Sequence, residues 1–512
     1  MTNKRMITAT ALMAVLAASS MAWSQPPAAG RGGPPAPPAP MPLSGATVKV
    51  AEGQVQGSLN GGVDVYRGIP FAAPPVGDLR WKAPAPAAKW SGVKAANVSN
   101  AGCASVEDCL YVNVFTPEGA KPGAKLPVMV WIYGGAFTGG SNALYDGSSF
   151  AKQGVIYVAL NYRLGRAGWF AHPALTKEAG KGPNANYGTM DQIAALKWVQ
   201  KNIGAFGGDN KNVTIFGESA GAISVNYLML APEAKGLFQK AIAESGFGRL
   251  EAKPLKGPGS AEETGSNWTK SIGITGDDAA AAKAMRALTW EDMKKGPLPL
   301  GSVGPIADGH LITGSSLKEF TEGKEMKIPY ILGGNSDEAS LTRSTTNTAQ
   351  RMAGITANKD KFLAAFDPDK QAQDNRTIAR LVTDELISEP DRALARDHSK
   401  DAPTWVYHFS YTPMATRATQ LGLGHGSEIG YVFNTPRGAG FDAEGTSISK
   451  AANAYWVAFA KTGDPGSAGG VAWPKWDGSS ESLMEFGPQG AAHVVSHFHK
   501  DRLDWVEALV AK

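Results

Sequence analysis

The chain has 512 residues, of which 50 are lysine or arginine and 46 are aspartate or glutamate, so its formal net charge is only +4. This charge is too small to indicate a nucleic acid or an anionic lipid surface as the partner. The length is large for one domain, but α/β enzymes reach it through insertions.

The first residues are typical of an export signal. Lys4 and Arg5 give a positively charged start, and an uncharged apolar stretch follows over 6–22. Ala22-Trp23-Ser24 places small residues at the cleavage positions. The apolar stretch is short for a membrane anchor and rich in Ala, Ser and Thr. We therefore predict a cleaved signal peptide over 1–24.

The segment after the signal peptide cannot pack a core. Residues 25–42 consist mainly of Pro, Gly and Ala, which predicts an extended linker. The remaining residues, 43–512, are predicted to form one domain. We expect an exported protein, periplasmic or secreted, with no membrane partner after signal cleavage. No feature of the sequence indicates an oligomeric state.

Short apolar runs alternate with helical patterns along the predicted domain. The runs at 126–133 and 154–160 are almost continuously apolar, as in strands buried on both faces. The predicted strands are Val48–Val50, Val63–Tyr66, Leu126–Tyr133, Gly154–Leu160, Val213–Phe216, Gln239–Ala243, Ile328–Leu332, Thr404–Tyr411 and Leu483–Phe486, and the predicted helices are Asp191–Ile203, Ala220–Leu230, Ser449–Ala460 and Arg502–Val510. This alternation predicts an α/β fold, in which helices flank a mostly parallel central sheet.

Two polar segments do not fit the central sheet. Residues 253–325 are rich in Gly, Pro and charged side chains, and residues 342–389 are polar with a helical pattern. We interpret both segments as insertions that cover the site.

Cys103 and Cys109 are the two cysteines of the chain. Exported proteins meet oxidising conditions, which favours a disulfide between them. A metal pair is the alternative, but no nearby histidine or third cysteine supports it. The loop would enclose only five residues, so we expect a modest entropic stabilisation.

The sequence Gly217-Glu218-Ser219-Ala220-Gly221 lies between a predicted strand and a predicted helix. A Gly-x-Ser-x-Gly at such a junction is typical of the nucleophile elbow of an α/β-hydrolase. The turn is so tight that side chains two residues before and after the serine would collide. We therefore predict Ser219 as the nucleophile, and we interpret Glu218 as a polar wall of the site without a role in proton transfer.

A serine hydroxyl becomes nucleophilic when a base takes its proton, and the base needs an acid to orient it. In this fold the chain order is serine, acid, histidine. His425 follows Ser219 and lies in a glycine-rich loop, which gives the imidazole room to reach the site. His408 lies within a predicted strand and is expected to be packed. The three histidines within 493–499 are interpreted as a surface strand end, not as a metal site.

Two candidates for the acid follow the predicted strand 328–332. Asp337 and Glu338 would both lie near the C-terminal end of that strand, where ligands of such sheets bind. Either carboxylate could instead cap a helix that begins near Ala339. The local sequence does not separate the two.

Backbone N–H groups are needed to stabilise the negative charge that develops on a substrate oxygen. The sequence Tyr133-Gly134-Gly135-Ala136-Phe137 follows the predicted strand 126–133, where the oxyanion loop of this fold belongs. Glycines there let the backbone approach a substrate closely. An ordinary glycine turn is the alternative, and the position after a buried strand favours the oxyanion loop.

From about Val48 to its C-terminus the chain resembles the type B carboxylesterase family, which includes the cholinesterases and bacterial para-nitrobenzyl esterases. The resemblance is specific because several separate motifs carry it. The matching segments are Tyr66–Ala72, Glu107–Val114, Asn161–Gly165, Phe206–Asp209, Phe216–Gly221, Asn335–Glu338 and His425–Glu428.

The resemblance implies a catalytic triad of Ser219, Glu338 and His425, and thus favours Glu338 over Asp337. It also implies two structural ion pairs, Arg80 with Glu107 and Arg163 with Asp191.

The same resemblance assigns the oxyanion donors to the N–H groups of Gly135, Ala136 and Ala220. Ala136 stands where many members have glycine, but its N–H group is intact.

One departure from the family concerns the loop between Cys103 and Cys109. In cholinesterases a long disulfide-closed loop carries a tryptophan that stacks on choline, whereas this short loop contains no tryptophan. A cation–π platform for choline is therefore not expected at this place. We expect a more open site, suited to a neutral or bulky ester.

The expected function is hydrolysis of a small-molecule carboxylic ester through an acyl-enzyme intermediate, with no metal and no organic cofactor. Two alternatives remain open from the sequence. One is a non-catalytic, esterase-like binding module, and the other is a hydrolase that acts on lactones or amides.

Overall fold

The structure, a computed structural model, describes residues 40–298, 301–355, 359–368, 370, 374–436 and 442–510. The predicted signal peptide (1–24) and most of the predicted linker (25–42) lie outside the described residues. Within the described ranges, no helix combines the length and the apolar character that a membrane crossing requires.

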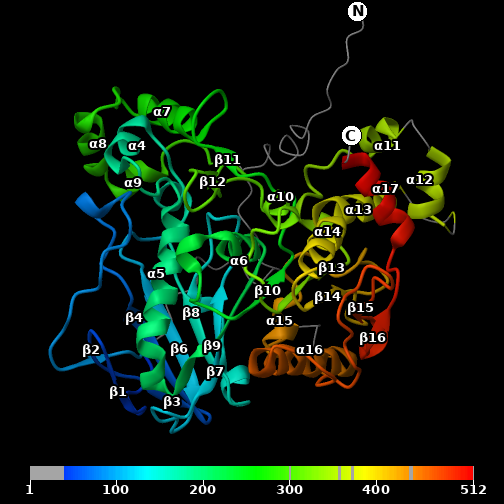
Figure 1. Cartoon of the computed structure of the whole chain (residues 1–512), viewed down its shortest axis with the longest axis horizontal. Helices are drawn as coiled ribbons and strands as arrows, with labels where there is room; N and C mark the ends of the chain where they lie inside the picture. The colour runs from blue at the N-terminus through cyan, green and yellow to red at the C-terminus, as the bar shows by residue number, and fades with distance from the viewer. Residues whose placement is uncertain are drawn as a thin grey trace, which may run out of the picture.

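A large twisted sheet runs through the molecule (Figure 1). In the described part of the chain it has eleven strands, in the order β16-β15-β14-β13-β10-β9-β7-β8-β6-β4-β3. The strands from β15 to β8 are parallel, and the pairs at both ends of the sheet are antiparallel. The strands are β3 (Ser58–Asn60), β4 (Val63–Pro70), β6 (Tyr111–Pro117), β7 (Leu126–Ile132), β8 (Ile156–Leu160), β9 (Gly208–Glu218), β10 (Lys240–Glu244), β13 (Tyr330–Asn335), β14 (Thr404–Phe409), β15 (Leu483–Phe486) and β16 (Ala492–Val495). The predicted α/β fold with a mostly parallel sheet is confirmed.

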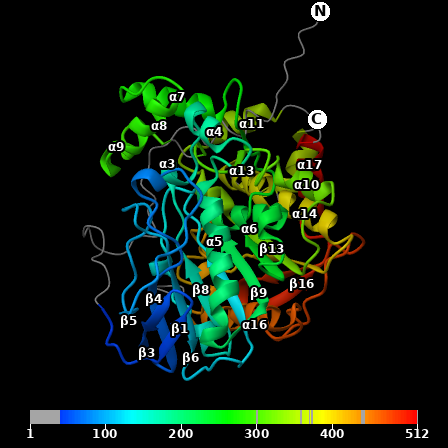
Figure 2. The same ribbon diagram turned by 60° about the vertical axis from the view of Figure 1, so that its left-hand side comes forward.

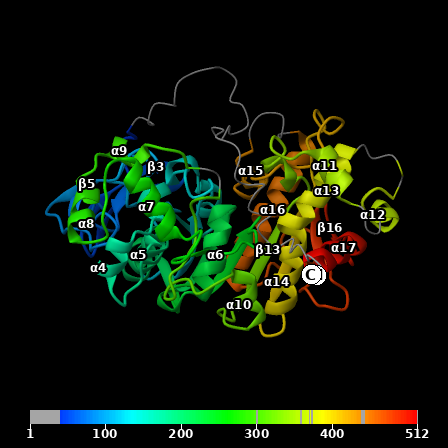
Figure 3. The ribbon, with the colours of Figure 1, turned by 90° about the horizontal axis from the view of Figure 1, so that it is seen from above.

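The central strands are buried because helices cover both faces of the sheet. Every residue of β8, β10, β13 and β14 is buried, as their apolar sequences predict. Helices α5 (Tyr187–Asn202) and α6 (Ala220–Leu230) pack together on one face, whereas α2 (Ser148–Ala151) and α16 (Ala443–Thr462) pack together on the other. Figure 2 shows α5 along its face of the sheet, and Figure 3 shows α6 and α16 on opposite sides.

Smaller elements surround this three-layer body. Two small sheets consist of β1 (Thr47–Val50), β2 (Gly53–Gln56) and β5 (Val93–Ala95), and of β11 (Lys253–Pro254) and β12 (Ile306–Ala307). The remaining short helices outside the two insertions include α3 (Gly165–Gly168), α4 (Pro173–Ala179), α14 (Glu389–His398), α15 (Ile429–Val432) and α17 (Lys500–Val510).

The two polar segments form helical insertions along the upper side of Figure 1, with α7, α8 and α9 at the left and α11, α12 and α13 at the right. The first contains α7 (Ala261–Ser271), α8 (Ala279–Arg286), α9 (Trp290–Lys294) and α10 (Ser316–Thr321). The second contains α11 (Thr348–Gly354), α12 (Lys359–Phe366), α13 (Asp374–Thr383) and a π-helical turn, η6 (Asp384–Ser388). Neither segment adds a strand to the large sheet, as the sequence predicts.

The first insertion is tied to the body by Arg80, a buried arginine. Its guanidinium forms a two-pronged pair with Glu107, with Nε–Oε1 and Nη2–Oε2 distances of 2.6 and 2.7 Å. Its Nη1 also donates to the carbonyl of Leu288, at 2.7 Å, just after α8. This ion pair, which the family resemblance implies, therefore joins the cysteine loop to the inserted helices.

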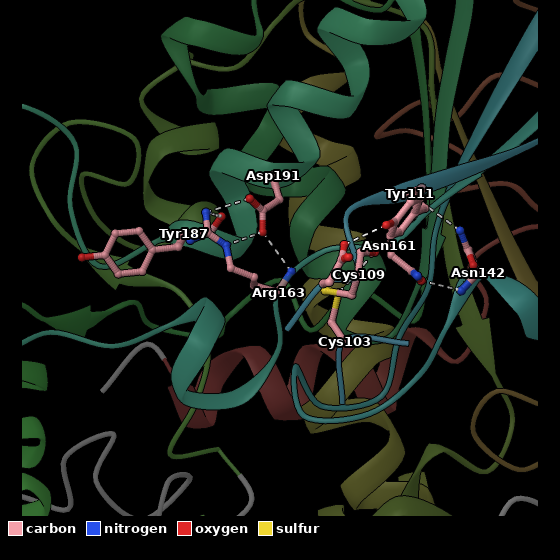
Figure 4. The surroundings of a disulfide bond; sticks show 9 residues. Cys103, Cys109, Tyr111, Asn142, Asn161, Arg163, Tyr187 and Asp191 are labelled. Carbon is pink, nitrogen blue, oxygen red and sulfur yellow. Dashed lines mark hydrogen bonds and ion pairs between the residues drawn. A yellow bond between two sulfur atoms is a disulfide. The ribbon is translucent and has the colours of Figure 1, made fainter. Parts of the chain in front are cut away.

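A disulfide and a second buried ion pair lie beside the strands that lead to the site (Figure 4). Cys103 and Cys109 are bonded, with their Cα atoms 5.1 Å apart. The side chain of Arg163 meets both carboxylate oxygens of Asp191 at 2.8 Å. The backbone N–H of Arg163 donates to the same carboxylate. The segment that contains Arg163 is thus anchored to helix α5.

Candidate active site

Ser219 occupies a strained turn between β9 and α6. Its backbone has φ 57° and ψ −123°, a conformation that costs free energy for any residue with a Cβ atom. Gly217 and Gly221 must be glycines because a side chain at either position would have no room. A Cβ atom at Gly217 would lie 2.5 Å from the carbonyl oxygen of Ile132, and one at Gly221 would lie 1.9 Å from the same oxygen. The Gly-x-Ser-x-Gly spacing thus has the steric origin that the sequence predicts.

The three residues predicted as a triad lie in one hydrogen-bonded row. The Nε2 atom of His425 is 2.9 Å from Oγ of Ser219, and its Nδ1 atom is 2.5 Å from Oε2 of Glu338. The row is buried, since the side chains of His425 and Glu338 are 4% and 0% exposed. The arrangement lets the imidazole accept a proton from the hydroxyl while the carboxylate stabilises the resulting cation.

Glu338 is held by two further hydrogen bonds. Its Oε1 atom accepts from the hydroxyl of Ser245 at 2.5 Å and from the backbone N–H of Asn335 at 2.7 Å. Ser245 itself has a positive φ of 56° at the end of β10. These donors fix the carboxylate so that its other oxygen faces His425.

The loop that carries His425 is joined to the loop that carries the acid. The backbone N–H of His425 donates to Oγ of Ser340 at 2.8 Å, and the N–H of Asp337 donates to the carbonyl of Leu423 at 2.9 Å. His425 and Glu338 are therefore positioned by one connected pair of loops.

Asp337, the other candidate for the acid, faces away from the imidazole. Its Oδ2 atom pairs with Arg343 on the following segment. Burial raises the pKa of Asp337, and the Arg343 guanidinium lowers it. Glu338, and not Asp337, contacts the histidine.

The glycine loop after β7 lies directly against Ser219. A Cβ atom at Gly134 would be 2.8 Å from the Cβ atom of Ser219, so only glycine allows this approach. Gly135 and Ala136 follow with positive φ angles of 119° and 52°. Within the described residues, no backbone acceptor takes the N–H groups of Gly135 or Ala136. Ala220 is the first residue of α6, so its N–H group has no partner within the helix.

The chain is similar to known proteins over most of its length. The family model described as "Carboxylesterase family" matches residues 44–504. The fumonisin B1 esterase of Sphingopyxis macrogoltabida is 35% identical over 85% of this chain and 85% of its own length. The para-nitrobenzyl esterase of Bacillus subtilis is 36% identical over 83% of this chain and 91% of its own. Among solved structures, a carboxylesterase of Geobacillus stearothermophilus has a TM-score of 0.77, with 31% identity over 90% of this chain and 99% of its own.

The chain belongs to the carboxylesterase family. It is a carboxylic ester hydrolase, and its α/β-hydrolase fold is that of these solved relatives.

In this carboxylesterase His425 also faces a second carboxylate, that of Glu218, which the sequence analysis interpreted as a polar wall of the site. The Oε1 atom of Glu218 lies 3.2 Å from Nε2 of His425. Burial lowers the pKa of His425, but the carboxylates of Glu338 and Glu218 outweigh burial and raise it to about 10. Burial raises the pKa of Glu218 to about 7, against the opposing effect of His425. Glu218 thus acts on the charge of the base.

We expect Glu218→Gln to move the acidic limb of the kcat/KM profile to lower pH, by about 1 unit. General-base catalysis needs the neutral imidazole, which is populated above the pKa of His425. Because a neighbouring carboxylate stabilises the imidazolium, its removal lowers this pKa. The check is a pH–rate profile of both proteins, with Glu233→Gln, an exposed site with the same charge change, as control. A limb that stays in place or moves to higher pH would contradict this electrostatic role.

Two more buried carboxyl groups, Glu244 and Glu428, lie near the hydrogen-bonded row, and sequence analysis did not identify them as parts of the site. Glu244 ends β10 and accepts a hydrogen bond of 2.8 Å from Nε1 of Trp456, and burial raises its pKa to about 8. Glu428 pairs with the side chain of Asn335, and burial raises its pKa well above the usual range. The sequence did offer a signal for both. Glu428 ends the motif that begins at His425, and Glu244 directly precedes Ser245.

An aromatic side chain also contacts the base. Phe247 has a positive φ of 47°, and its ring centroid is 5.7 Å from that of His425. The loop after β10 therefore supplies both the Ser245 hydroxyl that holds Glu338 and an apolar wall beside the imidazole.

The other histidines lie elsewhere. His408 is buried in β14, as predicted, and burial lowers its pKa to about 3. His493 lies on the edge strand β16, where its Nε2 atom is 3.1 Å from Oε2 of Glu485. Across the residues that the structure describes, no group of three or more His, Cys, Asp or Glu side chains is arranged to hold a metal ion.

Proposed function

We propose that the protein hydrolyses carboxylic esters through a covalent acyl-enzyme, with Ser219 as the nucleophile, His425 as the base and Glu338 as the orienting acid. The observation that carries this proposal is the row of contacts from Ser219 Oγ to His425 Nε2, at 2.9 Å, and from His425 Nδ1 to Glu338, at 2.5 Å. A hydroxyl, an imidazole and a carboxylate in this order are equipped for nucleophilic acyl transfer.

In the first half of the reaction the Ser219 oxygen attacks the ester carbonyl while His425 takes the hydroxyl proton. The N–H groups of Gly135, Ala136 and Ala220 stabilise the oxyanion of the tetrahedral intermediate. His425 then gives its proton to the leaving alcohol as the ester C–O bond breaks. Glu338 and Glu218 stabilise the imidazolium that exists between these two proton transfers.

In the second half a water molecule enters in place of the alcohol. His425 removes a proton from this water, and the resulting hydroxide attacks the acyl carbonyl. The bond to Ser219 breaks, the serine oxygen regains its proton from His425, and the carboxylic acid leaves. Each step uses only side chains and backbone groups of the chain.

An organophosphonate probe tests this proposal. We expect a stoichiometric mass increase, located by peptide mapping on Ser219 and accompanied by loss of para-nitrophenyl ester hydrolysis. A non-catalytic binding module would gain no mass and hydrolyse no ester, which would refute the proposal. Rates on matched esters, lactones and amides separate an esterase from the other hydrolases, and the ester is expected to be fastest.

The substrate proposed is a neutral or bulky small-molecule ester. The relatives named for fumonisin B1 and para-nitrobenzyl esters support small organic esters as the class. The short loop closed by Cys103 and Cys109 supports a site without a choline platform. We also propose that the protein is exported, because its cysteines form a disulfide, which persists in oxidising compartments.

A further inference from the structure

A cavity of about 1100 Å³ lies next to the loops that hold the triad. It is bounded by α13, by the segment 339–348 and by the loop 418–424, which leads to His425. Figure 1 shows α13 close to α11 and α17 on the side of the second insertion. Neither Ser219 nor the glycine loop 134–136 is among the described residues that line it. The cavity is therefore distinct from the space in front of the nucleophile.

The inner wall of this cavity is well fixed. Asp337, Ser340 and Gly424 line it, and they belong to the two loops that carry the acid and the base. Asp337 and Gly424 pair in a parallel bridge, and Oγ of Ser340 accepts the N–H of His425 at 2.8 Å. A ligand in the cavity would rest on a wall that the folded protein already holds in place.

The helical wall is equally preformed. Ile378 and Val382 of α13 line the cavity and also pack in a small hydrophobic core with Phe362 and Phe366 of α12. Leu421 faces the same space from the opposite loop. The cavity thus offers apolar surface to a ligand, and its volume suits a small organic molecule.

The charges around the cavity favour an anion. Three arginines line it, against two aspartates. Arg343 pairs with Asp337, and Nη1 of Arg380 donates to the carbonyl of Phe366 at 2.7 Å. Arg376 lies one helical turn before Arg380, on the same face of α13. Within the described ranges Arg376 forms no ion pair, so its guanidinium donors are available.

Neutral donors line the same cavity as Arg376. Asn375 precedes it on α13, and Thr348, Thr419 and Gln420 line the cavity from the neighbouring segments. A planar guanidinium beside amide and hydroxyl donors matches the two oxygens of a carboxylate.

We propose that this cavity is a second binding site of the protein, for an organic carboxylate with an apolar body. The carboxylate meets Arg376, and the apolar body lies against Ile378, Val382 and Leu421. The site is separate from the ester-binding site, so it can be filled while Ser219 is occupied.

The test is isothermal titration calorimetry of the whole protein with 1-naphthoate. Its uncharged counterpart, 1-naphthamide, has the same ring system without the negative charge. We expect one saturable site for 1-naphthoate, and binding at least about tenfold weaker for the amide, as the loss of a charge-assisted contact implies. Arg376→Gln should weaken 1-naphthoate binding by a similar factor. Lys89→Gln, an exposed site on the N-terminal part of the chain, removes the same charge and should change nothing.

Modification of Ser219 by the phosphonate separates this site from the active site. We expect 1-naphthoate to bind the modified and unmodified proteins equally. Absence of saturable binding, equal binding by Arg376→Gln and wild type, or loss of binding after modification would each overturn the proposal. Failure of the proposed function has a different signature, because Ser219 would take no label while naphthoate binding still depended on Arg376.

Discussion

Replacing Ser219 with alanine is expected to lower kcat on a para-nitrophenyl ester by about 10⁴- to 10⁶-fold, the largest loss from any substitution considered for this protein. The change removes only the oxygen that we propose forms the acyl-enzyme. Alanine keeps the Cβ atom, so the backbone strain at φ 57° is the same in the variant as in the wild type. The N–H groups of the proposed oxyanion loop remain, and we expect them to give a residual rate over water.

A second serine gives the matched control for this experiment. Ser224 lies one turn further along α6, and its hydroxyl donates to the carbonyl of Ala220 at 2.9 Å. Ser224→Ala should therefore keep kcat within a few-fold of wild type. Burst and steady-state kinetics on both variants measure the difference. If Ser219→Ala kept most of its ester turnover, the assignment of the nucleophile would be wrong.

The elbow could be predicted from sequence because its cause is local. A Cβ atom at Gly217 would lie 2.7 Å from the carbonyl of Gly221, so one collision is set within five consecutive residues. The strand before the elbow can also be predicted locally, since its continuous apolar run fits burial on both faces of a parallel sheet. The helix after the elbow is predicted from its own apolar sequence. The same local signals predicted the inner strands of the sheet correctly and the outer strands less well.

Strand β6 lies within a family motif but was not predicted as a strand. It is an antiparallel strand near the edge of the sheet, and its sequence lacks a continuous apolar run.

The choice between Asp337 and Glu338 could not be made locally. The two residues are adjacent, and the direction of each side chain depends on how the chain turns from β13 into the short 3₁₀ helix η5 (Glu338–Leu341). That turn is fixed by partners far away in sequence, such as Ser245, whose hydroxyl contacts Glu338, and Leu423, whose carbonyl accepts the N–H of Asp337. Only the family resemblance favoured Glu338 in advance.

The carboxyl groups around His425 also could not be predicted from the local sequence. Glu218 and Glu428 come from different parts of the chain, and the fold buries both where their charges act on the imidazole, whereas Glu244 is buried beside Glu218. In sequence each looks like an ordinary polar residue at a strand or loop end. Burial of so many carboxyl groups near a single cation costs free energy. The positive φ angles of Ser219 and Ser245 add backbone strain to this cost.

Glu338→Gln and Asp337→Asn should have opposite outcomes, although they change neighbouring residues in the same way. Glu338→Gln is expected to lower kcat by about 10⁴-fold, because an amide facing His425 Nδ1 neither stabilises the imidazolium nor holds the productive tautomer. Asp337→Asn should keep kcat within a few-fold of wild type, since its carboxylate pairs with Arg343 and not with the imidazole.

Thermal unfolding separates these effects on chemistry from effects on folding. Asp337→Asn removes a partly buried ion pair, so its cost should be a lower Tm with little change in turnover. Glu338→Gln keeps the shape of the side chain and can still accept a hydrogen bond from Ser245, so its kcat should fall far more than its stability. A large loss of turnover in Asp337→Asn at a temperature where the variant is folded, with an active Glu338→Gln, would reverse the assignment of the acid.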